Sequence, residues 1–419
     1  MTDTNESSQR RGRGDDQHGA LRATGPGHPA GDLAHDRALD PFDDALDDAL
    51  DAPVDLAIVG AGPTGLSAAV AAKQAGLTAV VFDKGCLVRS ITLYPTYATF
   101  FSTADRLEIG GVPFITPGDK PTRTDALKYY RRVATEFALD LRLYEEVVSI
   151  RGSKDDFRLR TRPMNGEQRV LRARNLVVAV GYAGQPNYMG VPGEDLPKVH
   201  HYYAEAHPYY DQDVIIIGAG NSAVEAALDC YRAGARVALV HFLDRLDRGV
   251  KPWIRPDIEN RLEKGEIRGL WNTRVAEILP DRVRLRQEET GAEWEVKNDF
   301  VLAMTGYRPD PSLLRELGVT VPDDTLIPAH DQETMQTDVP GVFIAGVVAG
   351  GNRPDRVFIE DGRHHGPLAV RAILAERGLE PAREISLGVP PSARAFDSEA
   401  DGIGWDERPA PEPAGRKLG

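Results

Sequence analysis

The segment Asp55-Leu-Ala-Ile-Val-Gly60-Ala-Gly62-Pro63-Thr64-Gly65 decides the fold, because a similar segment returns as Asp213-Val-Ile-Ile-Ile-Gly218-Ala-Gly220-Asn221-Ser222-Ala223. Each copy follows an apolar run, opens an alanine-rich segment with helical periodicity and leads to a second apolar run. This order is typical of the strand-turn-helix-strand unit that binds a mononucleotide. We therefore predict an α/β fold with two Rossmann-like dinucleotide-binding domains.

The small residues of each copy have separate roles. The first allows a tight turn out of the strand, the second lets the backbone approach a pyrophosphate at the helix N-terminus, and the third allows helix and strand to pack closely. These positions are Gly60, Gly62 and Gly65 in the first copy and Gly218, Gly220 and Ala223 in the second. A tight turn without a ligand is the alternative for either copy alone.

The ends of the two units differ and predict different ligands. The first ends at Asp83, whose carboxylate can accept hydrogen bonds from a ribose diol, as FAD requires. The second ends at His241 and is followed by Arg245, Arg248 and Lys251, a setting that suits the 2′-phosphate of NADPH. The alternative for this basic cluster is a solvated loop, since Asp244 and Asp247 alternate with the cations.

The composition excludes several classes of protein. A net charge of −14 and a pI of about 5.3 argue against nucleic acid or an anionic membrane as partner. No apolar run is long enough to span a bilayer. The two cysteines form no disulfide framework, no metal site is indicated, and residues 1–6 lack the pattern of a secretory signal. We therefore expect a cytoplasmic location.

Apolar runs that end in glycine predict a domain interrupted by an inserted one. Apolar strands closed by glycine run over Leu176–Gly181, Phe300–Gly306 and Gly341–Gly346, and the first two enclose the second nucleotide unit. The predicted parts are a disordered acidic leader (1–53), a first FAD part (54–187), an inserted NADPH domain (188–306), a second FAD part (307–377) and a flexible Pro-rich tail (378–419).

Longer motifs resemble a known family. The architecture is similar to that of thioredoxin-reductase-like flavoproteins, although Gly346 is followed by Val347 where these usually have aspartate. The segments Tyr94–Ser102, Asn187–Lys198, Lys251–Trp253 and Asn298–Tyr307 look like those of the YpdA family of bacillithiol-disulfide reductases. The resemblance covers about residues 55–376. It implies an FAD enzyme that uses NADPH to reduce a low-molecular-weight disulfide, most specifically bacillithiol disulfide, in thiol redox homeostasis.

The combined reasoning gives a set of expected contacts and a homo-oligomer as the expected assembly. The expected FAD residues are Gly60, Gly62, Pro63, Thr64, Gly65, Asp83, Lys84, Phe101, Ser102, Gly346 and Val347. The expected NADPH residues are Gly218, Gly220, Asn221, Ser222, Ala223, His241, Arg245 and Lys251.

The catalytic group is less defined. Members of the family commonly have cysteine where this chain has Thr64, which can donate a hydrogen bond but cannot form a mixed disulfide. Cys86 is a candidate redox residue and Cys230 reads as a packed helical residue; the chain lacks the vicinal cysteine pair of a thioredoxin reductase. His365 is a candidate proton donor. A flavin monooxygenase, a ferredoxin-NADP reductase and a non-enzymatic redox sensor remain alternatives.

Overall fold

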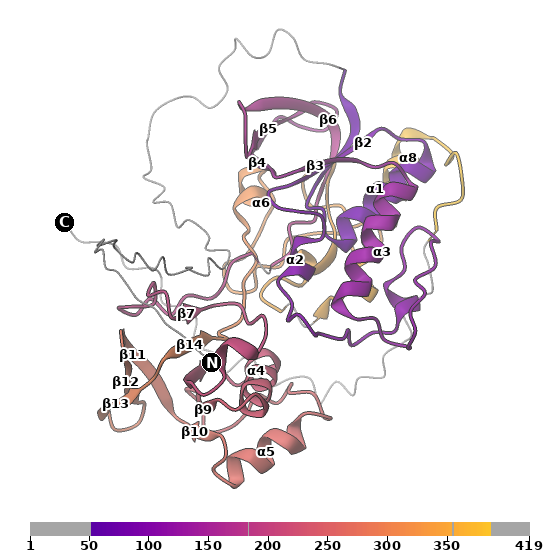
Figure 1. Ribbon diagram of the computed structural model, residues 1–419. Helices are drawn as coiled ribbons and strands as arrows, with labels where there is room; N and C mark the ends of the chain where they lie inside the picture. Colours follow the sequence, from indigo (N-terminus) through magenta and orange to yellow (C-terminus); the bar gives the residue numbers. More distant parts are fainter. Residues whose placement is uncertain (1–51, 183, 354–355, 387–419) are drawn as a thin grey trace, which may run out of the picture. The chain divides into compact units, whose positions relative to one another are not determined.

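The computed structural model describes residues 52–182, 184–353 and 356–386 (Figure 1). The predicted leader therefore lies outside the described residues except for Ala52 and Pro53, as does the predicted tail beyond Ser386. Within the described ranges, no helix is both long enough and apolar enough to cross a membrane.

The first sheet contains seven strands among the described residues. Its main order is β3-β2-β1-β6-β5-β4, and β15 also pairs with β6. Strand β6 changes partner along its length: Arg169 to Ala173 pair antiparallel with β5, and Leu176 to Val178 pair parallel with β15. The strands are β1 (Val54–Val59), β2 (Ala79–Asp83), β3 (Asp140–Leu143), β4 (Glu145–Arg151), β5 (Phe157–Pro163), β6 (Arg169–Val178) and β15 (Val342–Ile344).

Helices and loops cover both faces of this sheet. On one face the alanines of α1 pack with Val370 and Ile373 of α8, and Gly366 lets α8 approach Ala68 closely. The capping box of Thr122 and Asp125 starts α3, whose apolar side packs on α1. The elements are α1 (Pro63–Ala75), α2 (Arg89–Thr92), η2 (Ala104–Leu107), α3 (Arg123–Glu136), α6 (Ser312–Glu316), η4 (Gly346–Gly350), α7 (Ile359–Gly362) and α8 (His365–Arg377).

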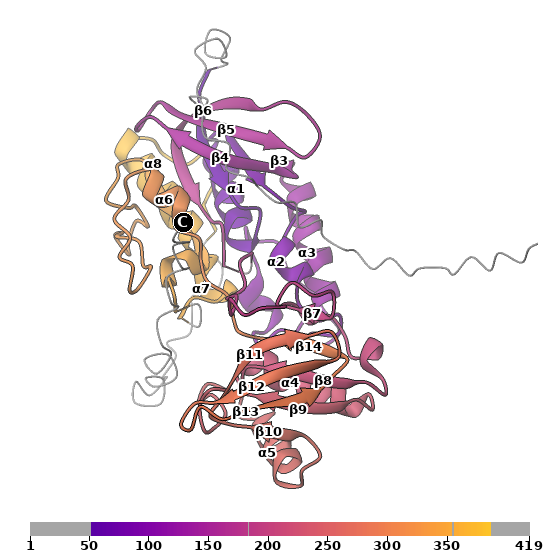
Figure 2. The same cartoon turned by 90° about the vertical axis from the view of Figure 1, so that its left-hand side faces the viewer.

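The second sheet has the order β10-β9-β8-β14-β7, and all of its strand pairs are parallel. Helix α4 packs on one face, and an antiparallel sheet in the order β11-β12-β13 packs on the other (Figure 2). The elements are β7 (Val199–His200), η3 (His207–Tyr209), β8 (Asp213–Ile217), α4 (Asn221–Arg232), β9 (Arg236–Val240), α5 (Arg255–Glu263), β10 (Arg268–Leu270), β11 (Thr273–Leu279), β12 (Arg282–Gln287), β13 (Glu293–Lys297) and β14 (Phe300–Ala303).

The predicted α/β class with two largely parallel sheets is confirmed. Both repeated segments form a strand, a glycine turn, a helix and a parallel strand, as β1-α1-β2 and β8-α4-β9. The second and third sheets use only strands between Val199 and Ala303, whereas the first sheet uses strands on both sides of that range. The two glycine turns are therefore held at the carboxyl ends of parallel strands, where α/β proteins bind nucleotides.

Candidate functional site

The first glycine turn contains two glycines that the polypeptide itself requires. Gly60 has a φ of +114°, and a Cβ there would lie 2.2 Å from the Ala179 carbonyl oxygen. A Cβ at Gly65 would lie 1.9 Å from the Gly60 carbonyl oxygen. These contacts explain the tight turn and the close approach of α1 to β1.

Gly62 is different, because nothing in the described chain requires a glycine there. Its φ of −74° and ψ of 175° are open to any residue, and a Cβ would meet no atom within 4 Å. Gly62 is also the N-cap of α1 and makes no side-chain capping hydrogen bond. The open space at a helix N-terminus fits a pyrophosphate, which the positive end of the helix dipole would attract.

Asp83, at the end of β2, is fixed against this turn. Its Oδ2 accepts a hydrogen bond from the Ala61 N–H at 2.8 Å, and its Oδ1 accepts one from the Gly85 N–H at 2.7 Å. The carboxylate thus lies beside the glycine turn, as an adenosine ribose would need. Lys84 is exposed next to it, and Cys86 is half-buried in the same loop.

Thr64, at the start of α1, lies where α1, η4 and α7 meet. Its hydroxyl donates to the Ala345 carbonyl at 3.5 Å. A Cβ at Gly346 would lie 2.5 Å from Thr64 Oγ1, and a Cβ at Gly362 would lie 2.8 Å from Thr64 Cγ2. The threonine therefore packs tightly between η4 and α7, and the half-buried Val347 follows Gly346 in η4.

His365 begins α8 and contacts the same turn. Its Nδ1 accepts a hydrogen bond from the Gly346 N–H at 3.1 Å. Burial, with smaller contributions from His330 and His364, lowers the pKa of His365 to about 4. The imidazole is therefore neutral near pH 7 with its proton on Nε2, so it can donate a hydrogen bond from Nε2 but carries no second proton to transfer.

Phe101 and Ser102 lie in the loop before η2, and Phe101 contacts a residue from the second nucleotide unit. Its ring stacks on Trp253 with centroids 5.4 Å apart and an interplanar angle of 11°. Lys120 Nζ lies 5.1 Å from the Phe101 centroid and 5.4 Å from the Trp253 centroid. The sequence placed Phe101 near a flavin ring but gave no sign of this pairing.

The second glycine turn repeats the geometry of the first. Gly218 has a φ of +121°, and a Cβ there would lie 2.4 Å from the Met304 carbonyl oxygen. Gly220 caps α4 in an extended conformation without a side-chain hydrogen bond, and only the Asp247 carboxylate lies near its Cβ position, at 3.0 Å. Ala223 is buried and Ser222 is exposed. This turn also fits a pyrophosphate.

Asn221 connects the second turn to the loop that carries the predicted basic cluster. Its Nδ2 donates to the Gly249 carbonyl at 2.9 Å, and its Oδ1 accepts from the Lys251 N–H at 2.8 Å. The Asn221 side chain is therefore used for holding the loop rather than pointing freely at a ligand.

The predicted basic cluster is only partly available to a phosphate. Lys251 Nζ is paired with Glu225 of α4 at 2.5 Å, and Arg245 donates to Asp244 at 3.1 Å. His241 is 5% exposed, with Nε2 3.5 Å from Asp247 Oδ1. A 2′-phosphate would have to compete with these carboxylates, which the interleaved acids of the sequence had already suggested.

Sequence reasoning missed a cation beside this loop. The guanidinium carbon of Arg274 in β11 lies 4.6 Å from the Phe242 ring centroid. No motif marked Arg274, since it is brought next to Phe242 by the backbone hydrogen bonds from Thr273 to His241 and from Asn272 to Leu243 rather than by closeness in sequence.

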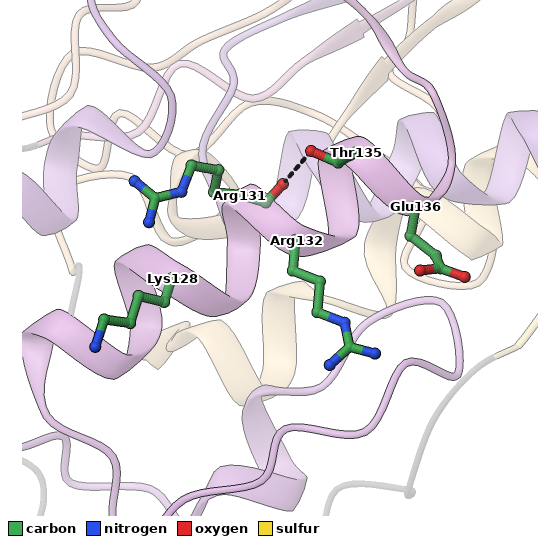
Figure 3. Close-up of a pocket in the computed structure, with 5 residues that line it drawn as sticks. All are labelled: Lys128, Arg131, Arg132, Thr135 and Glu136. Carbon is green, nitrogen blue, oxygen red and sulfur yellow. Dashed lines mark hydrogen bonds between the residues drawn. The ribbon is translucent and has the colours of Figure 1, made fainter.

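A shallow hollow of about 520 Å³ lies over α3 and is separate from both glycine turns. Figure 3 shows its lining of charged and hydroxyl side chains from this helix: Lys128, Arg131, Arg132, Thr135 and Glu136. None of the predicted cofactor residues lines it. It is the solvated face of a helix whose other face, including Tyr129 and Val133, is buried.

The two cysteines are free and differ in environment. Cys230 is 0% exposed, and burial, reinforced by Asp229, raises the pKa of its thiol to about 12. It is a packed helical residue, as predicted, and stays protonated near pH 7. Within the parts of the chain that the structure describes, no group of His, Cys, Asp and Glu side chains is arranged to hold a metal ion.

Comparison with known proteins identifies the family. A family model for pyridine nucleotide-disulphide oxidoreductases matches residues 57–346. The bacilliredoxin reductase Bdr of Bacillus subtilis is 44% identical over 309 residues, which cover 74% of this chain and 94% of that protein. The chain belongs to the pyridine nucleotide-disulphide oxidoreductase family. It is a flavoprotein disulfide reductase of the pyridine nucleotide-disulphide oxidoreductase class, and the predicted resemblance to YpdA is confirmed.

Solved structures agree with this membership. The bacillithiol disulfide reductase Bdr (YpdA) from Bacillus cereus is 40% identical with a TM-score of 0.75, covering 77% of this chain and 99% of that one. The protein of the same name from Staphylococcus aureus is 39% identical with a TM-score of 0.72, covering 78% of this chain and 100% of that one. A flavin-containing monooxygenase from Stenotrophomonas maltophilia, 22% identical with a TM-score of 0.58, shares the fold alone.

Proposed function

We propose that this protein binds FAD at the first glycine turn and NADPH at the second, and reduces a low-molecular-weight disulfide, specifically bacillithiol disulfide. The observation that carries the proposal is the presence of two such turns in one chain, each opening a helix at an extended glycine: Gly62 has open space at its Cβ position, and Gly220 has only the Asp247 carboxylate nearby. The choice of bacillithiol disulfide as the substrate rests on the names of the Bdr relatives. The reaction consumes one NADPH, one disulfide and one proton, and yields NADP⁺ and two thiols.

Gly62, Asp83 and Gly220 carry this proposal. Gly62 and the N-terminus of α1 hold the pyrophosphate of FAD, and Asp83 accepts hydrogen bonds from its ribose. FAD, when bound, supplies the two-electron chemistry that links a nicotinamide to a disulfide. Gly220 and the N-terminus of α4 hold the pyrophosphate of NADPH. The NADPH domain, residues 188–306, is inserted between the two FAD parts.

Thr64 bears on how the disulfide is reduced. Thr64 stands where the family commonly has cysteine, and a threonine offers no sulfur for a mixed disulfide. Its hydroxyl donates to the Ala345 carbonyl instead. We propose that FAD, if bound here, would supply the electrons without a sulfur from this chain, and that the neutral His365 would donate a hydrogen bond from Nε2–H to the departing thiolate, which takes its proton from solvent. We also propose a cytoplasmic homo-oligomer, the setting expected from the sequence.

The test is NADPH oxidation by the purified, flavin-loaded protein under anaerobic conditions, followed at the NADPH absorbance band. The substrates are the disulfides of bacillithiol, glutathione, coenzyme A and cysteine. We expect oxidation of one NADPH per bacillithiol disulfide and slower oxidation with the others. Absence of oxidation with every disulfide would overturn the proposal.

Two further arms separate the alternatives. Stoichiometric oxygen consumption with an oxygenated product indicates a monooxygenase, and rapid reduction of a one-electron acceptor alone indicates a ferredoxin-NADP reductase. The Gly62→Val variant, prepared without flavin, is the control for oxidation that does not depend on the cofactor.

A further inference from the structure

Arg274 lies at the end of β9, where nucleotide-binding units distinguish a ribose hydroxyl from a 2′-phosphate. The His241 N–H donates to the Leu270 carbonyl at 3.0 Å, and the Thr273 N–H donates to the His241 carbonyl at 2.9 Å. These two bonds draw the start of β11 across the end of β9. Arg274, the next residue, therefore lies over Phe242.

The guanidinium of Arg274 is oriented by two contacts. Its carbon lies 4.6 Å from the Phe242 ring centroid, and its Nε donates to Glu288 Oε2 at 2.9 Å. Among the described residues, its two terminal amino groups have no hydrogen-bond partner. A planar cation that is stacked on a ring and held by Nε presents this terminal edge in a fixed direction.

Two of the cations named after β9 are already engaged with acids, whereas Arg248 is exposed. Lys251 is paired with Glu225, and Arg245 is paired with Asp244. The buried His241 faces Asp247. Arg274 differs from these cations because Phe242 and Glu288 orient its side chain while its terminal edge stays available, and a guanidinium edge matches phosphate oxygens in a bidentate manner.

We propose that Arg274, oriented by Phe242 and Glu288, is the residue that selects NADPH over NADH by binding the 2′-phosphate. The inference rests on the proposed use of NADPH but not on the identity of the disulfide. It adds a residue from the antiparallel sheet to the site predicted from the β9 loop.

The test is calorimetric binding of adenosine 2′,5′-bisphosphate and of 5′-AMP to the flavin-loaded protein. These probes carry the adenosine half of NADPH and NADH and undergo no redox reaction. We expect Arg274→Ala to weaken the bisphosphate at least tenfold and 5′-AMP less than twofold. Arg274→Lys, which keeps the charge but loses the planar edge, should show an intermediate loss of the bisphosphate.

Arg282→Ala is the matched control. Arg282 lies at the far end of β12 and is ion-paired with Asp281 and Glu295, so its removal should leave both affinities unchanged. An Arg274→Ala variant that binds the bisphosphate as tightly as the parent overturns the inference. So does a parent that binds both probes equally. A parent that selects the bisphosphate through Arg274 yet reduces no disulfide overturns the proposed reaction and upholds the inference.

Discussion

The ring of Phe101 stacks on the indole of Trp253, although the two residues come from different nucleotide-binding units. Both side chains are about half exposed, and Lys120 Nζ lies close to both rings. The pair therefore joins the loop after the first unit to the loop after β9 through a contact that shields little apolar surface. Its contribution should come from ring stacking and from the nearby cation.

We predict that Phe101→Ala and Trp253→Ala are energetically coupled. A stacked pair contributes about 0.5–1.5 kcal/mol beyond simple burial, so the double variant should be less destabilised than the sum of the single variants by that amount. The measurement is urea unfolding followed by circular dichroism. Tyr97→Ala is the control, because Tyr97 lies in the same loop, is 82% exposed and makes no ring contact among the described residues. Additive effects of the two substitutions would mean that the stack does not persist in solution.

The two glycines of the first turn should respond differently to substitution. Gly62→Val should fold with unchanged apoprotein stability, since its backbone is extended and its Cβ meets open space, but it should be isolated colourless. Gly65→Val should lower the apoprotein melting temperature, because its Cβ would lie 1.9 Å from the Gly60 carbonyl oxygen. The measurements are thermal melts of flavin-free protein and the visible absorbance after purification. A yellow Gly62→Val protein with full flavin content would remove the first turn as the FAD site.

His365 should make folding stability depend on pH. Its pKa falls from 6.5 to about 4 on folding, so between these values the unfolded chain binds a proton that the folded protein does not. The stabilising effect is fully present above pH 6.5 and is lost as the pH falls towards 4, with a total on the order of 3 kcal/mol. His365→Asn keeps an acceptor for the Gly346 N–H but does not titrate, so it should flatten the dependence.

The measurement is the free energy of unfolding in urea from pH 4 to pH 7 for the parent and for His365→Asn. His207→Asn, at an exposed position, is the control and should keep the parent's slope. Equal slopes for the parent and His365→Asn would contradict the burial of an uncharged imidazole beside Gly346.

The fold could be predicted from sequence because it depends on local signals. Gly60 and Gly218 need positive φ and Gly65 needs close packing, and these requirements leave a fixed spacing in the chain. Asp83 could be predicted for the same reason, since it ends the second strand of the same strand-turn-helix-strand unit. The repeated pattern therefore predicts the two strand-turn-helix-strand units and their glycine turns.

The contacts between distant segments could not be predicted in this way. The ion pair of Lys251 with Glu225 depends on the path of the loop after β9, and the approach of Arg274 to Phe242 depends on the backbone hydrogen bonds that hold the start of β11 against the end of β9. The hydrogen bond from Gly346 to His365 depends on how α8 packs on α1. Charge and hydrogen bonding at the second turn are set by these tertiary contacts, so the sequence indicated a basic cluster but not which cation was available.

The last prediction concerns whether a cysteine takes part in the reaction. With threonine at position 64, Cys86 and Cys230 are the only sulfhydryls of the chain. The Cys230 thiol is buried with a pKa raised to about 12, so it is not a nucleophile near neutral pH. Cys86 follows Asp83, the residue proposed to bind the adenosine ribose, and an FAD bound there would extend away across the carboxyl ends of the strands. A disulfide at the reacting end of the cofactor would therefore be far from Cys86.

We predict that Cys86→Ser, alone or combined with Cys230→Ala, keeps NADPH-dependent reduction of bacillithiol disulfide within about threefold of the parent. Alanine is used at position 230 because Cys230 is fully buried in an apolar cluster on α4. The measurement is anaerobic NADPH oxidation with flavin content matched between the proteins, and Cys230→Ala alone is the control for changes in packing. A hundredfold loss from Cys86→Ser, equivalent to about 2.7 kcal/mol of transition-state stabilisation, would make Cys86 the relay, because direct contact between disulfide and cofactor needs no sulfur from the protein.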